Sequence, residues 1–135
     1  MTNVPLAARV VAILDEDGRP LSETTAAAAY EGDILEVLIS AGTINGVKED
    51  MRFVLYEEGD ELFDPVTSGS LGRFELVKGR AKAVHVQEKM SRVRSTQTRR
   101  VASLPSLYKG SGEPEYRTVA VPFKGVKIGD IVRPI

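Results

Sequence analysis

Five carboxylate side chains gather in one short stretch and are the first candidates for chemistry. They are Glu57, Glu58, Asp60, Glu61 and Asp64. A hydrolase would need two of them at a fixed separation, one with a raised pKa, and nothing in the stretch marks such a pair. A calcium loop would need oxygen ligands at defined alternating positions, and this spacing lacks that pattern. We therefore expect a solvated acidic loop that serves as an interaction surface.

The other reactive residue types are too few or too isolated for the common catalytic sites. The chain has no cysteine, which excludes disulfides, thiolate zinc sites and cysteine nucleophiles. His85 is the only histidine, so a multi-histidine metal site is excluded as well. Gly110-Ser111-Gly112 lacks the Lys-Ser/Thr pair that a phosphate-binding loop requires. The sequence thus predicts a protein that is not an enzyme and holds neither a metal nor a cofactor.

A run of basic residues is the strongest local signal. Positions 78 to 100 hold eight Lys or Arg residues against one acid, Glu88. The eight are Lys78, Arg80, Lys82, Lys89, Arg92, Arg94, Arg99 and Arg100. Such a run could neutralise nucleic-acid phosphates, which gives salt-dependent affinity, but it contains no aromatic residue on which bases could stack. A solvated face or a protein-docking arm is the favoured interpretation, and a nucleic-acid-binding segment is the alternative.

The near-neutral total charge of -1 hides a separation along the chain. Residues 1–77 carry a net charge of -10 and residues 78–135 carry +9. If the fold interleaves the two halves, these charges pair within the molecule. If it keeps them apart, the protein has unlike faces that could bind a polyanion or associate head to tail with another copy.

Length and composition limit the class of protein. At 135 residues the chain is expected to form one domain with a core that needs no covalent staple. No apolar run approaches the roughly 20 residues of a membrane span. The first residues lack the pattern of a secretory leader, so we expect a cytoplasmic protein, with incorporation into a larger particle or envelope structure left open.

The residue pattern is that of a β protein. Segments rich in Val, Ile, Thr and aromatics alternate with turns among 12 Gly and 7 Pro. Predicted strands cover residues 7–14, 34–40, 51–56, 73–78, 80–87, 116–123 and 126–132, whereas residues 88–104 fit either a strand or a helix period. We predict an all-β fold: a small antiparallel barrel of the SH3 or OB type, with a long loop or arm and at most one or two helical turns. Residues 1–135 form one barrel domain, with 21–32 and 95–115 as loop or arm insertions.

Three sequence blocks, in order, carry a family resemblance. They are Gly46–Tyr56 (GVKEDMRFVLY), Asp64–Gly72 (DPVTSGSLG) and Val86–Ser91 (VQEKMS). With their spacing they make residues 33–94 resemble the C-terminal domain of flagellar assembly protein T and related small β-barrel modules of bacterial envelope proteins. In the family pattern a glycine stands at the positions of Asp50 and Ser68.

The resemblance implies a small barrel that acts as a structural or docking module, and it brings no catalytic residues. Together with the charge separation, it leads to the functional prediction. We expect a non-enzymatic structural or protein-docking module of a bacterial assembly, which interacts through an acidic face and a basic arm. Its partner would be another protein or a second copy, with a homo-oligomer expected. The alternative is a nucleic-acid-binding barrel that uses residues 78–100.

Overall fold

The computed structural model describes residues 8–21, 32–102 and 115–135, and these fold as strands and turns. The strands are β1 (Ala8–Ile13), β2 (Glu36–Ile39), β3 (Arg52–Phe63), β4 (Ser70–Val86), β5 (Ser91–Ser95), β6 (Thr98–Ala102), β7 (Tyr116–Ala120) and β8 (Ile131–Pro134). Among the described residues the only helical element is one 3-10 turn, η2 (Thr43–Asn45). The all-β prediction is therefore confirmed.

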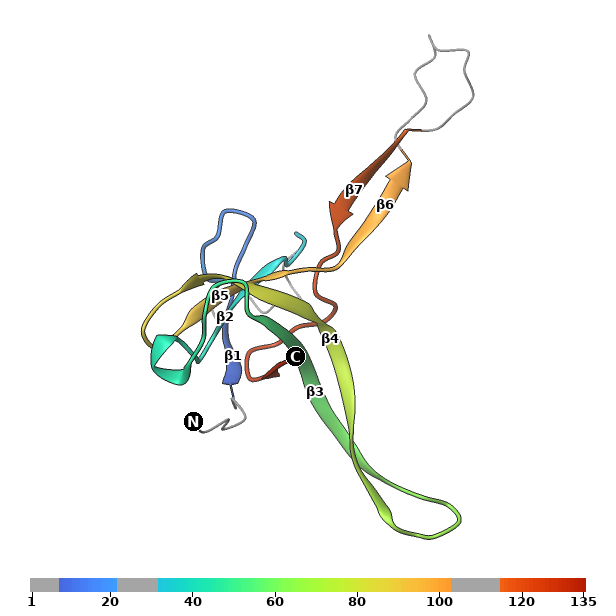
Figure 1. Cartoon of the computed structure of the whole chain (residues 1–135). Helices are drawn as coiled ribbons and strands as arrows, with labels where there is room; N and C mark the ends of the chain where they lie inside the picture. The colour runs from blue at the N-terminus through green and yellow to red at the C-terminus, as the bar shows by residue number, and fades with distance from the viewer. Residues whose placement is uncertain (1–7, 22–31, 103–114) are drawn as a thin grey trace.

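Six strands close into a barrel in the order β1-β2-β5-β4-β3-β8, and β8 pairs back onto β1 (Figure 1). Every pairing in the barrel is antiparallel. β3, β4 and β5 form a meander, whereas β8 is inserted between β1 and β3. The predicted small antiparallel barrel is confirmed, with six strands in the ring.

The barrel interior is filled by apolar side chains, which alternate with outward-facing residues most clearly in β1, β2 and β5. β1 shows the pattern most simply, since Ala8 and Val10 are buried while Arg9 and Val11 face outward. Phe53 and Leu55 of β3 and Val93 of β5 are fully buried in the same cluster. This two-residue period is what a sheet with one face on the core requires.

β3 and β4 extend far beyond the barrel as one long hairpin, which projects from its lower side in Figure 1. The sequence analysis ended the first of these strands at Tyr56 and placed a loop over residues 57–72. The ladder instead continues to the pair Phe63–Ser70. Residues 57–63 were not predicted as a strand because most of them are exposed. Without a buried face, their sequence lacks the apolar alternation by which a strand is recognised.

Three bulges interrupt the β3–β4 ladder. At the innermost one Leu55 pairs with Gly79 and Tyr56 with Val77, which leaves Lys78 as the extra residue. The predicted strands 73–78 and 80–87 break at Gly79, and the irregularity in the ladder lies there. Gly79 has φ +157°, and an added Cβ would lie 2.6 Å from Cδ1 of Phe123. The bare glycine therefore lets the Phe123 ring pack directly on the strand.

A second hairpin, formed by β6 and β7, stands outside the barrel as its own two-stranded sheet. Its base is held to β4, because Thr96 N–H donates to Arg80 O over 3.0 Å and Lys124 N–H donates to Lys78 O over 2.9 Å. Residues 88–104, ambiguous in sequence, thus supply β5 and β6 and the described part contains no helix. The predicted insertions cover residues 21–32 and 95–115. Of these, residues 22–31 and 103–114 lie outside the described residues.

Two non-glycine residues adopt left-handed backbone conformations. They are Asp50, with φ 66°, and Ser68, with φ 62°. Ser68 closes the tip of the long hairpin, where its N–H donates to Asp64 O over 2.8 Å. Both turns keep the geometry that glycine would adopt at lower cost.

Candidate functional site

The predicted acidic loop is a strand and a turn. Glu57, Glu58, Asp60 and Glu61 lie in β3, and Asp64 begins the turn at the tip. We call residues 57–77 the acidic hairpin, since they carry six Asp or Glu and one Arg. The cross-strand hydrogen bonds with β4 override the weak strand propensity of the acidic residues. The carboxylates are therefore held on a paired ribbon rather than on a free loop.

One face of the acidic hairpin is apolar. Leu62 lies opposite Gly72, and Phe74 and Leu76 follow Gly72 at two-residue steps along β4, so their side chains share a face. We call Leu62, Phe74 and Leu76 the apolar stripe. Their side chains are 49%, 52% and 46% exposed. An added Cβ on Gly59 would lie 3.4 Å from Cδ2 of Phe74, so the Phe74 ring lies against the bare backbone of Gly59. The stripe has no cover within the described residues beyond its own strands.

The other face of the acidic hairpin is charged and internally satisfied. Arg73 lies opposite Glu61 and makes an ion pair of 3.9 Å with Glu58. Near the barrel, Arg133 binds Glu75 through two hydrogen bonds of 2.9 and 3.1 Å. The stripe's face is thus apolar apart from Glu57, which lies opposite Leu76, whereas this face carries the paired charges together with the exposed side chains of Phe63 and Val77. Asp60 has no ion-pair partner among the described residues.

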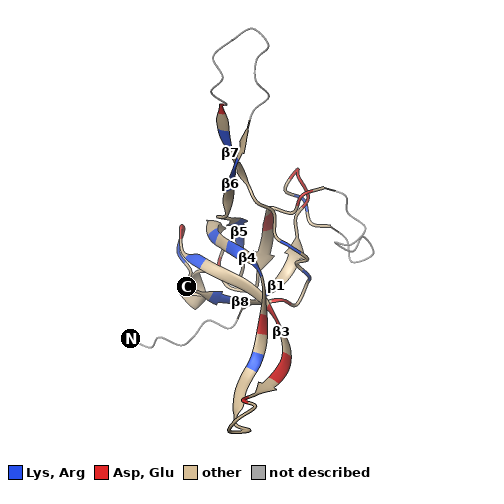
Figure 2. Ribbon diagram, turned by 90° about the vertical axis from the view of Figure 1, so that its right-hand side faces the viewer, with Lys and Arg blue, Asp and Glu red and all other residues tan. Residues whose placement is uncertain are grey.

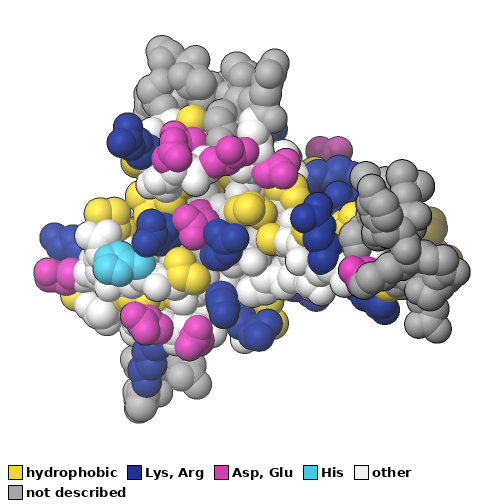
Figure 3. Space-filling view, turned by 90° about the horizontal axis from the view of Figure 1, so that it is seen from above, with side chains coloured by type: hydrophobic (Ala, Val, Ile, Leu, Met, Phe, Trp, Pro, Cys, Tyr) yellow, Lys and Arg dark blue, Asp and Glu magenta, His cyan; other side chains and the backbone are white. Residues whose placement is uncertain are grey.

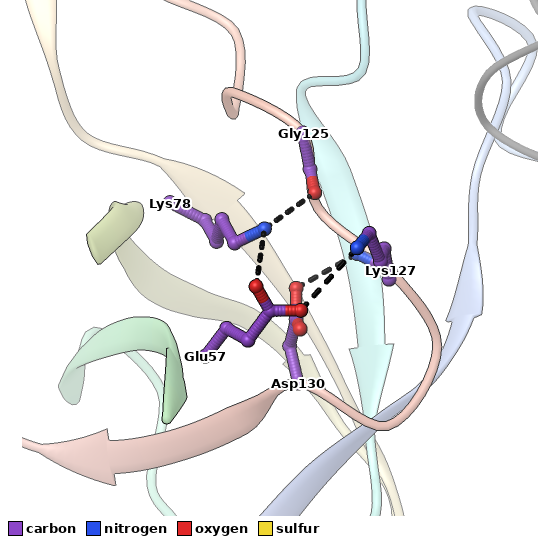
Figure 4. Close-up of polar contacts among 5 residues, drawn as sticks. All are labelled: Glu57, Lys78, Gly125, Lys127 and Asp130. Carbon is purple, nitrogen blue, oxygen red and sulfur yellow. Dashed lines mark hydrogen bonds and ion pairs between the residues drawn. The ribbon is translucent and has the colours of Figure 1, made fainter. Parts of the chain in front are cut away.

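A polar cluster holds the base of the acidic hairpin (Figure 4). The bulge turns Lys78 inward, where it is only 6% exposed and its Nζ donates to Gly125 O over 2.9 Å. Glu57 lies 3.8 Å from Lys78 Nζ and 3.3 Å from Lys127 Nζ. Asp130 accepts a 2.8 Å hydrogen bond from Lys127 N–H. Burial raises the pKa of the Asp130 carboxyl, opposed by that hydrogen bond and by the charge of Lys78.

The eight basic residues of the predicted arm come together only in part. Lys82 lies opposite Arg94, and Arg80 and Arg92 stand two residues from them, so four of the eight share the outer face of the β4–β5 ladder. On that face Lys82 is paired with Asp50 at 3.9 Å and Arg94 with Glu36 at 3.4 Å. Lys78 is buried in the cluster just described, Lys89 lies in the β4–β5 turn, and Arg99 and Arg100 lie on β6. From above, basic side chains lie among acidic ones rather than in a continuous band (Figure 3).

The β6–β7 hairpin carries a second group of basic residues. We call Thr98–Ala102 with Tyr116–Ala120 the basic hairpin; it carries Arg99, Arg100 and Arg117 and no acid. Arg100 stacks on the Tyr116 ring at 4.4 Å, which uses one face. Arg117 was missed by the sequence analysis because it lies outside the basic run. Arg117 lies opposite Val101 only because β6 and β7 pair, and no local sequence pattern predicts that pairing.

The opposite face of the basic hairpin carries unpaired cations. Arg99 lies opposite Val119, and Val101 lies opposite Arg117, so these four side chains share one face. The two arginines are exposed, and the two valines are half-buried. Neither Arg99 nor Arg117 has an ion-pair partner within the part of the chain that the structure describes. This surface therefore offers apolar contacts between two free positive charges.

The two hairpins leave the barrel in opposite directions, which both ribbon views show (Figures 1 and 2). In Figure 2 the charged residues of the acidic hairpin below are mostly acidic, and those of β6 and β7 above are basic. The separation of charge along the sequence thus survives in space at these two projections. Elsewhere the halves interleave and pair, as in Arg94–Glu36 and Arg133–Glu75.

The described residues contain little that resembles a reaction centre. Within residues 8–21, 32–102 and 115–135 no three side chains of the metal-ligating types are grouped. A shallow hollow beside the polar cluster is bordered by Arg9, Glu57, Lys127 and Asp130 among others. Its charges are already engaged with one another or with backbone groups, as Arg9 is with Gly129 O. No helix in the described ranges has the length and apolar character to cross a membrane.

Comparison with known proteins adds no further constraint. No protein-family model, no curated protein and no solved structure matches the chain. The geometry that remains to be explained is a closed barrel from which two hairpins of opposite charge project in opposite directions.

Proposed function

We propose that the chain is a non-enzymatic structural module that docks into a larger protein assembly through its two projecting hairpins. The observation that carries this proposal is the pair of hairpins of opposite charge, which leave the barrel from neighbouring strands and project in opposite directions. Neither hairpin contributes to the barrel core beyond its base, so folding alone gives them no role. The resemblance to a bacterial assembly protein over residues 33–94 supports the same class of function.

The charge distribution favours docking to protein over binding to nucleic acid. A nucleic-acid groove would gather cations along one surface, with aromatic rings exposed for stacking. Here Lys78 is buried, Lys82 and Arg94 are paired with acidic residues, and Arg100 occupies one face of the Tyr116 ring, which is 53% exposed. The basic hairpin offers a small cationic face that alternates Arg with Val, which suits an acidic and partly apolar protein surface.

The test is size-exclusion chromatography with light scattering and absorbance at 260 and 280 nm, at low and high salt. We expect protein-only particles at a multiple of 14.7 kDa in low salt, which dissociate in high salt because screening weakens contacts between exposed charges. A peak rich in 260 nm absorbance that loses it in salt would transfer the proposal to nucleic-acid binding. A monomer at high protein concentration and low salt would refute assembly through the charged hairpins.

A further inference from the structure

We infer that the apolar stripe of one copy docks on the Arg-Val face of the basic hairpin of a second copy, so that chains join head to tail. This rests on the proposed function and names its partner and its contact surfaces. The stripe (Leu62, Phe74, Leu76) and the receiving face (Arg99, Val101, Arg117, Val119) lie on different hairpins of each molecule.

The stripe needs a partner because of its exposure. Three large apolar side chains, each about half exposed, share one face of a two-stranded ribbon that has no second layer in the described structure. Two-stranded ribbons are marginal unless their apolar face is covered. Contiguous exposed apolar surface of this kind is typical of interaction sites.

The face of the hairpin is the docking element, and its edges are not. The outer edge of β3 beyond Tyr56 is interrupted by bulges at Glu58–Glu61 and Leu62–Phe63 and bordered by acidic residues. Bulges and charges are the devices by which proteins prevent strand addition at an exposed edge. A partner is therefore recognised by side chains on the apolar face rather than by backbone pairing.

Charge complementarity selects a second copy as the occupant. The stripe lies on a hairpin with six acids and one base, among which Asp60 has no ion-pair partner in the described residues. The receiving face presents Arg99 and Arg117 on either side of Val101 and Val119. Neither arginine has an ion-pair partner among the described residues. Apolar surface thus meets apolar surface, and acidic flanks meet arginines.

The geometry also excludes pairing within one molecule. The hairpins project in opposite directions from the barrel, so the stripe of a chain faces away from its own basic hairpin (Figures 1 and 2). A contact between two different surfaces is heterologous, and it generates a ring or an open chain of copies according to the rotation at each contact. The patch is small, so we expect weak association that needs high protein concentration to populate.

The experiment compares two disabled variants alone and mixed. The stripe variant carries Leu62→Thr, Phe74→Thr and Leu76→Thr, which keep strand propensity at exposed positions. Its matched control is Phe63→Thr with Val77→Thr, which removes side chains that are 57% and 53% exposed but lie off the stripe. The receiver variant carries Arg99→Glu and Arg117→Glu, with Lys89→Glu and Lys124→Glu as its control. Circular dichroism verifies that each variant is folded.

Light scattering at low salt should show that the wild type and both controls assemble, whereas the stripe and receiver variants each weaken assembly at least tenfold. An equimolar mixture of the two disabled variants should form a dimer of about twice 14.7 kDa that grows no further, since it joins one intact stripe to one intact receiving face. A folded stripe variant that assembles like the wild type would overturn this inference and leave the docking function standing. A mixture that stays monomeric would also overturn it. A wild type that remains monomeric in low salt would instead refute the proposed function itself.

Discussion

Removal of the buried Lys78 ammonium should destabilise the protein more than any exposed ion pair does. Lys78 is the bulged residue of β4, and its Nζ donates to Gly125 O over 2.9 Å while it lies 3.8 Å from Glu57. A hydrogen bond to a charged group contributes about 1.5–3 kcal/mol. Truncation to alanine also removes packed methylenes worth roughly 0.8 kcal/mol each, offset by the desolvation cost that the charge no longer incurs. We expect Lys78→Ala to lower the free energy of unfolding by about 2–3 kcal/mol.

A short series separates the contributions of the Lys78 side chain. Lys78→Met keeps most of the stem but leaves Gly125 O without its donor, so we expect a loss of about 1 kcal/mol. Lys127→Ala removes the other cation beside Glu57, and because its side chain is 66% exposed the loss should stay below about 0.5 kcal/mol. Urea unfolding followed by circular dichroism gives all three values. For a chain of this length, the alanine variant should also lower Tm by roughly 10 °C.

Two results would refute the reasoning about Lys78. If Lys78→Met is as stable as the wild type or more stable, the desolvation cost of the ammonium outweighs its hydrogen bond, as happens for some buried ion pairs. If Lys78→Ala costs no more than Lys127→Ala, the cluster in Figure 4 does not hold the base of the acidic hairpin.

Three further perturbations test other parts of the structure. Gly42→Ala should lower stability by at least about 3 kcal/mol or prevent folding, because its Cβ would lie 2.1 Å from the backbone oxygen of Gln87; urea unfolding with Gly69→Ala as control measures this. Ser68→Gly should raise the free energy of unfolding by up to about 1 kcal/mol and Tm slightly, since glycine adopts φ 62° without strain. A lower Tm in a thermal melt would contradict that. Asp130→Asn should be more stable than the wild type at pH 7, because the raised pKa of the buried carboxyl means that its charge is disfavoured in the folded state; this advantage should fade as the pH falls through the raised pKa towards 3.8, and urea titrations that show it growing towards acid would reverse the sign.

The barrel was predictable because its strands follow a rule that depends on the sequence alone. In Ala8–Ile13 buried and exposed residues alternate, and the turn around Asp15 and Gly18 ends the strand where Gly and Asp predict it. Apolar alternation reports burial on one face, and a closed barrel gives every strand in its ring such a face. The same signal therefore predicted β1 and β2 to within two residues, whereas the strand expected at 126–132 begins only at Ile131.

Sequence patterns did not predict the two projecting hairpins. Residues 57–63 are paired but largely exposed, so acidic side chains are tolerated there and the segment has the composition of a loop. The burial of Lys78 depends on a bulge that shifts the register by one residue, and a shift of that kind reverses which side chains face inward. The basic run was continuous in sequence, yet Lys78 turns inward and Arg99 and Arg100 leave with β6, so only its β4 and β5 members share a surface.

The attachment of the basic hairpin to β4 has a mechanical consequence. Both hairpins leave the barrel at the same end of the β4–β5 ladder, next to the pair Ala81–Ser95. Tension between their tips would therefore peel that ladder open from one end instead of shearing all its hydrogen bonds together. The first contacts to bear the load would be Thr96 N–H to Arg80 O and Lys124 N–H to Lys78 O, with Phe123 seated on Gly79 behind them. A pulled molecule should yield at this junction while the β1–β2 and β3–β8 ladders stay closed.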